Sequence, residues 1–180
     1  MSILPKYGLL QLRNSARIYT KDVTESLQLF KKETKNLKVT VFLSYHPDEL
    51  EELDSAINFL KDFDVLIYAD WLDENIPRDK SDITSKQLQQ QIQENKKFIF
   101  LATETAVQSK WCDWVLRLAA TIKAPEDIVV LPIREDFSDY GGADYLKKHA
   151  YIKENDFTAL AYDVKYPNGD EKTLAEWFTS

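Results

Sequence analysis

Four short apolar runs, separated by amphipathic segments, constrain the fold of this chain more than any other feature. None of the runs contains a charged residue, and they occupy residues 39–43, 65–69, 98–102 and 128–133. In the intervening segments apolar residues recur at steps of three and four, as from Leu50 to Leu53 and Ile57, which is typical of one helix face. Strands that alternate with helices favour a parallel sheet covered on both faces. With a weak further strand near residues 160–162, the sequence predicts a flavodoxin-like α/β fold of about five strands.

The residues before the first apolar run predict an additional helix. Apolar positions at Leu12, Ala16, Tyr19, Val23, Leu27 and Phe30 fall at steps of three and four, so the segment is amphipathic. Residues 1–40 carry 8 Lys and Arg against 3 Asp and Glu, which is typical of a solvated helix face or of a surface for an acidic partner. We therefore predict an N-terminal helical arm at residues 1–37 and a domain at residues 38–180.

The overall charge and the cysteine content limit the classes of function. The net charge is −7, and an acidic body argues against nucleic-acid binding. Cys112 is the only cysteine, so an internal disulfide is impossible and a cytoplasmic location is expected. We predict neither a signal peptide nor a membrane span, because the apolar runs are short.

Several common catalytic patterns are absent from the sequence. Four glycines are present and none joins a predicted strand to a helix, which argues against a phosphate-binding loop. The two histidines, His46 and His149, are far apart in the chain, so no metal site is predicted. The third apolar run continues into Ala102-Thr103-Glu104 without an aspartate, which argues against a phospho-receiver domain.

Candidate binding residues follow the predicted strands, because ligands of such folds lie at the carboxyl ends of the strands. A polar loop without periodicity, residues 72–83, follows the second strand, and long loops in compact domains are often functional. Thr84 or Ser85 is predicted to cap the next helix and Ser109 the one after. Asp48 and Glu49 are interpreted as charges at a helix start. The strand-end candidates for binding are Ser44, Tyr45, Asp70 and Trp71.

Five segments in order resemble the Toll/interleukin-1 receptor (TIR) domain family, in particular bacterial stand-alone TIR proteins of antiphage defence. They read VFLSY at residues 41–45, YADW at 68–71, FIFLAT at 98–103, SKWC at 109–112 and VVLPI at 129–133. The resemblance implies that residues 70–83 are the BB loop, which mediates contacts between TIR domains and borders the substrate pocket. It also implies that Trp111 lies near that pocket, although an aromatic residue that opens a helix commonly packs on the sheet.

Many members of this family cleave the nicotinamide–ribose bond of NAD⁺, so NAD⁺ is a possible substrate or ligand, with no cofactor required. The resemblance places the catalytic glutamate four residues after the tryptophan of the SxWC motif, and that position is Val115. A carboxylate stabilises the positive charge that develops on the ribose, and valine cannot.

Two functions therefore remain open. The chain is either a signalling module that assembles with other TIR domains, or an active NAD⁺ nucleosidase or ADP-ribosyl cyclase in which Glu104 or Asp70 replaces the missing carboxylate. Asp113 cannot replace it, because two residues along a helix correspond to about 200° of rotation. A flavodoxin-like domain outside the TIR family is a third reading.

Overall fold

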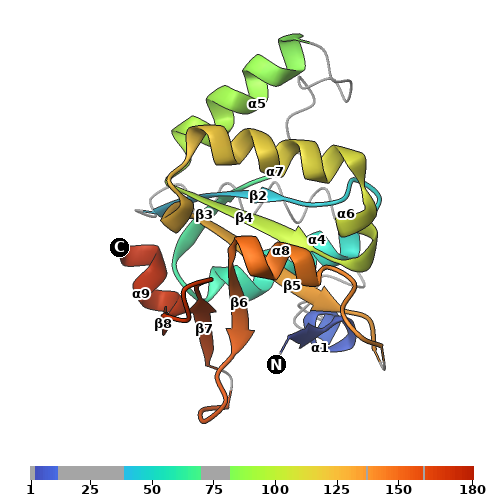
Figure 1. Ribbon diagram of the computed structural model, residues 1–180, viewed down its shortest axis with the longest axis vertical. Helices are drawn as coiled ribbons and strands as arrows, with labels where there is room; N and C mark the ends of the chain where they lie inside the picture. Colours follow the sequence, from blue (N-terminus) through green and yellow to red (C-terminus); the bar gives the residue numbers. More distant parts are fainter. Residues whose placement is uncertain (1–2, 12–38, 70–81, 137, 160) are drawn as a thin grey trace, which may run out of the picture.

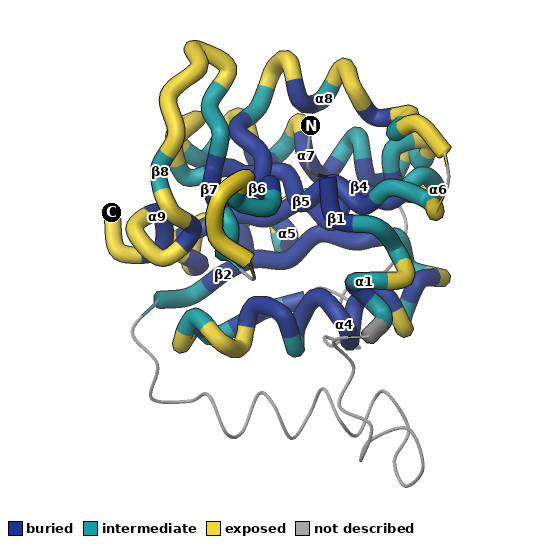
Figure 2. The backbone as a smooth tube through the Cα atoms, turned by 90° about the horizontal axis from the view of Figure 1, so that it is seen from below, coloured by how far each residue is buried: buried dark blue, intermediate teal, exposed yellow. Residues whose placement is uncertain are grey.

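The computed structural model describes residues 3–11, 39–69, 82–136, 138–159 and 161–180. The predicted amphipathic helix from Leu12 onward and residues 72–81 of the predicted loop lie outside these residues. The loop prediction is wrong for residues 82 and 83, which belong to helix α5 (Asp82–Glu94). The described parts form three layers, with a sheet between two sets of helices (Figure 1). Figure 2 shows that the strands at the centre of the sheet are buried and that exposed residues lie on the outer turns of the helices and on the loops.

Five parallel strands form the centre of the sheet. In spatial order they are β3 (Val65–Tyr68), β2 (Val39–Ser44), β4 (Lys97–Ala102), β5 (Ile128–Arg134) and β6 (Ala150–Glu154). All four pairings between them are parallel. Numbered by their order in the chain, these strands stand 2-1-3-4-5, which is the flavodoxin-like order. The predicted fold is confirmed.

Three short strands extend this centre. Strands β7 (Tyr162–Lys165) and β8 (Glu171–Thr173) pair antiparallel at the β6 edge, and β1 (Leu4–Pro5) pairs parallel with the end of β5. The predicted weak strand corresponds to β7, which begins where the prediction ended. The last helix, α9 (Leu174–Thr179), follows β8 directly.

The helices divide between the two faces, as predicted. On one face α1 (Lys6–Gln11), α4 (Leu50–Lys61) and α9 pack into an apolar cluster with the sheet. A second cluster lies on the opposite face. It involves α5 (Asp82–Glu94), α6 (Glu104–Gln108), α7 (Lys110–Ile122) and α8 (Ala143–Lys148).

The helix starts agree only partly with the sequence. Ser109 caps α7 as predicted, because its hydroxyl accepts a hydrogen bond from the Cys112 backbone N–H. The caps predicted at Thr84 and Ser85 are wrong: α5 begins at Asp82, so both residues lie inside the helix. Glu49 is the N-cap residue of α4, but its side chain makes no capping bond.

Helix α8 and strand β6 were not predicted from the sequence. Helix α8 has six residues, too few for a periodic pattern. Strand β6 ends in Lys153 and Glu154 and so looks polar, yet Lys153 is buried. Its ammonium pairs with Asp156 at 2.9 Å and Glu171 at 3.5 Å, which allows a lysine within the sheet.

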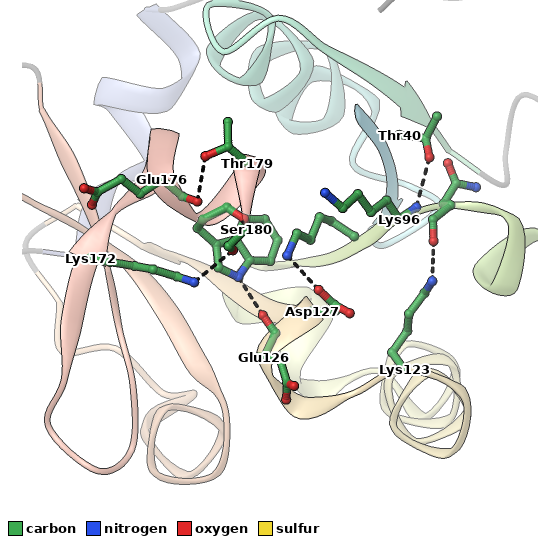
Figure 3. A network of polar contacts seen from close by, with 12 residues as sticks. Thr40, Lys96, Lys123, Glu126, Asp127, Lys172, Glu176, Thr179 and Ser180 are labelled. Atoms are coloured by element: carbon green, nitrogen blue, oxygen red, sulfur yellow. Dashed lines mark hydrogen bonds and ion pairs between the residues drawn. The ribbon is translucent and has the colours of Figure 1, made fainter. Parts of the chain in front are cut away.

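A buried ion pair fastens the C-terminal helix to the amino end of β4. Lys97 is 1% exposed, and its Nζ lies 2.6 Å from Oδ1 of Asp127 in the 3₁₀ helix Pro125–Asp127. The same ammonium lies 4.9 Å from the centre of the Trp177 ring. The Trp177 indole in turn donates a 2.8 Å hydrogen bond to the Glu126 carbonyl. Figure 3 shows Glu126 and Asp127 close to the C-terminal residue Ser180, with these two contacts as dashed lines.

We expect Asp127→Ala to lower the free energy of unfolding by about 2–4 kcal/mol, because it leaves the Lys97 charge buried without its carboxylate. Replacing both partners, as Lys97→Met with Asp127→Ala, removes the charge as well and should recover most of that loss. Urea denaturation of the three proteins checks this. A double variant as unstable as Asp127→Ala would show that the pair has another role.

Candidate functional site

The carboxyl ends of β2 and β4 bring several predicted residues together, but mostly inside the protein. Ser44 and Tyr45 are both buried, and Tyr45 belongs to the cluster on the α4 face. The Tyr45 carbonyl accepts a contact from the Cys112 thiol at 3.6 Å, which joins the start of α7 to the end of β2. This burial favours a structural role for Ser44 and Tyr45 over direct contact with a ligand.

A hydrogen bond between Thr103 and Glu49 joins the end of β4 to the start of α4. The Thr103 hydroxyl donates to Oε2 of Glu49 at 2.5 Å and accepts from the Ala106 backbone N–H at 3.0 Å. Both side chains are buried. Glu49 does stand at a helix start, as the sequence suggested, but its carboxylate is buried and bonded to Thr103. The contact joins residues 54 positions apart, so no local signal could have revealed it.

The residues that follow β4 and β5 are also engaged with one another. Glu104 accepts a 2.8 Å hydrogen bond from the Gly141 backbone N–H. Tyr140 donates a 3.0 Å hydrogen bond to the Ala102 carbonyl at the end of β4. Burial, and then the negative charge of Glu104, raise the pKa of Tyr140 far above its usual value. The phenol therefore remains a hydrogen-bond donor at physiological pH.

A lysine that the sequence did not single out links α1 to the same end of the sheet. The ammonium of Lys6 lies 3.2 Å from both Glu52 in α4 and Glu135 after β5. Burial alone would lower the pKa of Lys6, but the bonds to Glu135 and Glu52 raise it overall. The first described residues are thereby held against the strand ends.

Trp111 is the one tryptophan predicted near the site that lies within the described residues. The other two predicted residues, Asp70 and Trp71, lie outside them. Trp111 is half-buried against the apolar cluster of α5 and α7. Its ring centre lies 5.1 Å from that of Trp114, with the planes inclined at 46°. This placement agrees with packing on the sheet and leaves part of the indole accessible.

Val115 is a core residue. Its exposed fraction is 0%, and it shares the apolar cluster with Phe42 in β2 and Phe100 in β4. Asp113, two residues earlier, faces elsewhere: its carboxylate accepts from Arg117 at 2.9 Å and from the Tyr145 hydroxyl at 3.3 Å. A carboxylate at position 115 would have to enter an apolar environment.

The described residues offer no metal site and no membrane span. Among them, no group of three or more His, Cys, Asp or Glu side chains is arranged to hold a metal ion. None of the helices in this part of the chain is long and apolar enough to cross a membrane.

We expect Thr103→Val to lower the free energy of unfolding by about 2–4 kcal/mol, because α6 loses its cap and the Glu49 carboxylate loses a donor. Thr103→Ser retains the hydroxyl and should stay within about 1 kcal/mol of the unaltered protein, since it removes one methyl group. Equal stability of the two variants in urea would contradict this role of Thr103.

We expect Val115→Glu to cost on the order of 3–5 kcal/mol at neutral pH, because it buries an unpaired carboxylate. Burial raises the pKa of such a carboxyl, so the loss should be small below the unfolded value of about 4.3 and grow as the pH rises. Thr121→Glu places the same charge on an exposed turn of α7 and is the control. Thermal unfolding across pH measures both; a Val115→Glu protein as stable as this control would mean that position 115 is open to solvent.

Comparison with known proteins agrees with this arrangement. No curated protein matches the chain. The sequence pattern of the TIR domain family matches residues 41–163, which run from within β2 to the start of β7. The chain belongs to the TIR domain family.

Proposed function

We propose that this protein is a signalling and assembly TIR domain of the bacterial antiphage type that does not cleave NAD⁺ on its own. Its expected partners are other TIR domains, either further copies or a different effector, and its expected location is the cytoplasm. NAD⁺ or a derived nucleotide remains a possible ligand. The burial of Val115 in the apolar core is the observation that carries the proposal.

The chemistry of NAD⁺ cleavage explains why Val115 matters. Breaking the bond between nicotinamide and ribose builds positive charge on the sugar, which an adjacent carboxylate stabilises. The resemblance to the family places that carboxylate at position 115, and a valine offers neither charge nor a hydrogen bond. Loss of one such group costs on the order of 10²- to 10⁴-fold in rate.

The other described carboxylates near the start of α7 already have partners. Glu49 is held by Thr103, Glu104 by the Gly141 N–H, and Asp113 by Arg117 and Tyr145. Bringing any of them to a ribose would break a hydrogen bond or an ion pair. This supports a module without turnover.

We also propose that residues 1–37 act as an arm whose role differs from that of the TIR domain at residues 38–180, with its residues 4–11 docked on that domain as β1 and α1. The arm is rich in Lys and Arg, and the remaining chain is acidic. An acidic partner surface is the matching target for such a segment.

An active NAD⁺ nucleosidase or cyclase is the second candidate, and one observation favours it. Glu49 and Glu104 both stand where parallel strands end, which is where folds of this class bind ligands. In this case a carboxylate from the strand edge replaces the one expected at position 115.

Incubation of the purified protein with NAD⁺, followed by measurement of nicotinamide release, separates the two candidates. We expect release no faster than with heat-inactivated protein, alongside a TIR enzyme of established activity as positive control. Turnover would overturn the proposal. In that event Glu49→Gln and Glu104→Gln, measured separately, would identify the carboxylate responsible.

A further inference from the structure

The turn between β6 and β7 carries an aromatic side chain far out into solvent. Phe157 is 97% exposed, and Tyr7, at 63%, is the other large hydrophobic residue that is exposed in the described part of the chain. The turn extends past the end of the sheet at the bottom of Figure 1. Full exposure of a phenylalanine has an unfavourable hydration free energy, which burial against a partner would remove.

Hydrogen bonds fix the shape of this turn, residues 154–158, which we call the tip. The side-chain oxygen of Asn155 accepts from the backbone N–H groups of Phe157 at 2.9 Å and Thr158 at 2.8 Å. The amide nitrogen of the same side chain donates to Asp163 in β7 at 2.7 Å. Asp156, beside the aromatic residue, is anchored by Lys153. A pre-formed tip loses little conformational entropy on binding, so this one is suited to recognition.

A groove between α7 and α8 has the size and lining to receive such a tip. Its volume is about 420 Å³, ample for one aromatic side chain. Leu116 and Ala120 from α7 and Tyr145 from α8 form its apolar part. Arg117 and Lys148 border the same space, and cations of this kind interact favourably with an aromatic face.

The charges of the groove and the tip are complementary. Both acids of the groove are already paired, Asp113 with Arg117 and Asp144 with Lys147. Among the described residues, the Lys148 side chain has no hydrogen bond or ion pair. Across the contact, the tip carries Glu154 and Asp156 on either side of Asn155, and one cation, Lys153, precedes it and pairs with Asp156, so two acids stand against one base. Lys148 is therefore the cation available to an incoming acidic tip.

The tip and the groove of one molecule cannot meet. His149, at the groove, immediately precedes β6, and the tip begins where β6 ends. Five strand residues separate them by about 17 Å at a rise of about 3.3 Å per residue. Figure 1 shows α8 beside the start of β6 and the turn beyond its end. Two copies placed one after the other along the β6 direction would bring a tip to a groove.

We propose that the Phe157 tip of one copy of this protein docks into the α7–α8 groove of a second copy. The contact is head-to-tail, so each copy keeps one unused tip or groove and the assembly extends into an open chain or closes into a ring. The contact area is small, which predicts weak association that depends on protein concentration. This inference rests on the proposed assembly function and names the surfaces that perform it.

Sedimentation velocity over a range of concentrations tests the contact. We expect the unaltered protein to form larger species as its concentration rises. Phe157→Ser, which removes the tip, and Ala120→Arg, which fills the groove from an exposed position, should each weaken association on the order of 10- to 100-fold. Tyr7→Ser removes the other exposed aromatic side chain and should associate like the unaltered protein.

The decisive experiment mixes the two variants that associate weakly. Phe157→Ser retains a groove and Ala120→Arg retains a tip, so together they should form a one-to-one dimer that grows no further. If the unaltered protein assembles and both variants assemble equally well, the contact is wrong while the assembly function stands. A mixture that stays monomeric beside an assembling parent also overturns the contact. An unaltered protein that is monomeric at every concentration overturns both the contact and self-assembly.

Discussion

Burial of the central strand on both faces is the constraint on which the rest of this structure depends. Every residue of β4 is buried, so the helices on each side must present apolar side chains to it. Helix α7 meets this demand with Cys112, Val115, Leu116 and Ala119. The polar side chains of that helix are displaced to its outer face, where Asp113 and Arg117 pair with each other. Packing against the core therefore determines which side chains of α7 face the sheet and which face solvent.

The strand-end edge of this TIR domain consists largely of polar groups that hold the protein together. Thr103 joins β4 to the start of α4 through Glu49, Glu104 holds the turn before α8, and Lys6 joins α1 to the end of β5. Each contact stabilises a segment at the carboxyl ends of the strands. This chain therefore retains the fold of the family. It has an apolar residue at position 115, where the resemblance leads us to expect the catalytic carboxylate. The function that we propose for such a chain therefore depends on assembly.

The sequence predicted the centre of the fold well because uncharged runs between periodic helices leave few alternatives. It missed β6 because a buried lysine looks like a surface residue, and it missed α8 because six residues show no period. The bond between Thr103 and Glu49 depends on the register of β2 against β4, and the exposure of Phe157 depends on the Asn155 turn. Neither is encoded by a local pattern. The roles predicted for Asp70 and Trp71 concern residues outside those described, and the correspondence of Val115 to the catalytic position stays a prediction.

The central claim is that residue 115 faces the core and not a ligand. Nuclear Overhauser contacts of the Val115 methyl groups, measured with and without saturating NAD⁺, test it most directly. We expect contacts to aromatic rings of the surrounding cluster, such as Phe42 and Phe100, that NAD⁺ leaves unchanged. Contacts from those methyl groups to the ribose or nicotinamide protons would contradict it, because they would place position 115 in the binding site.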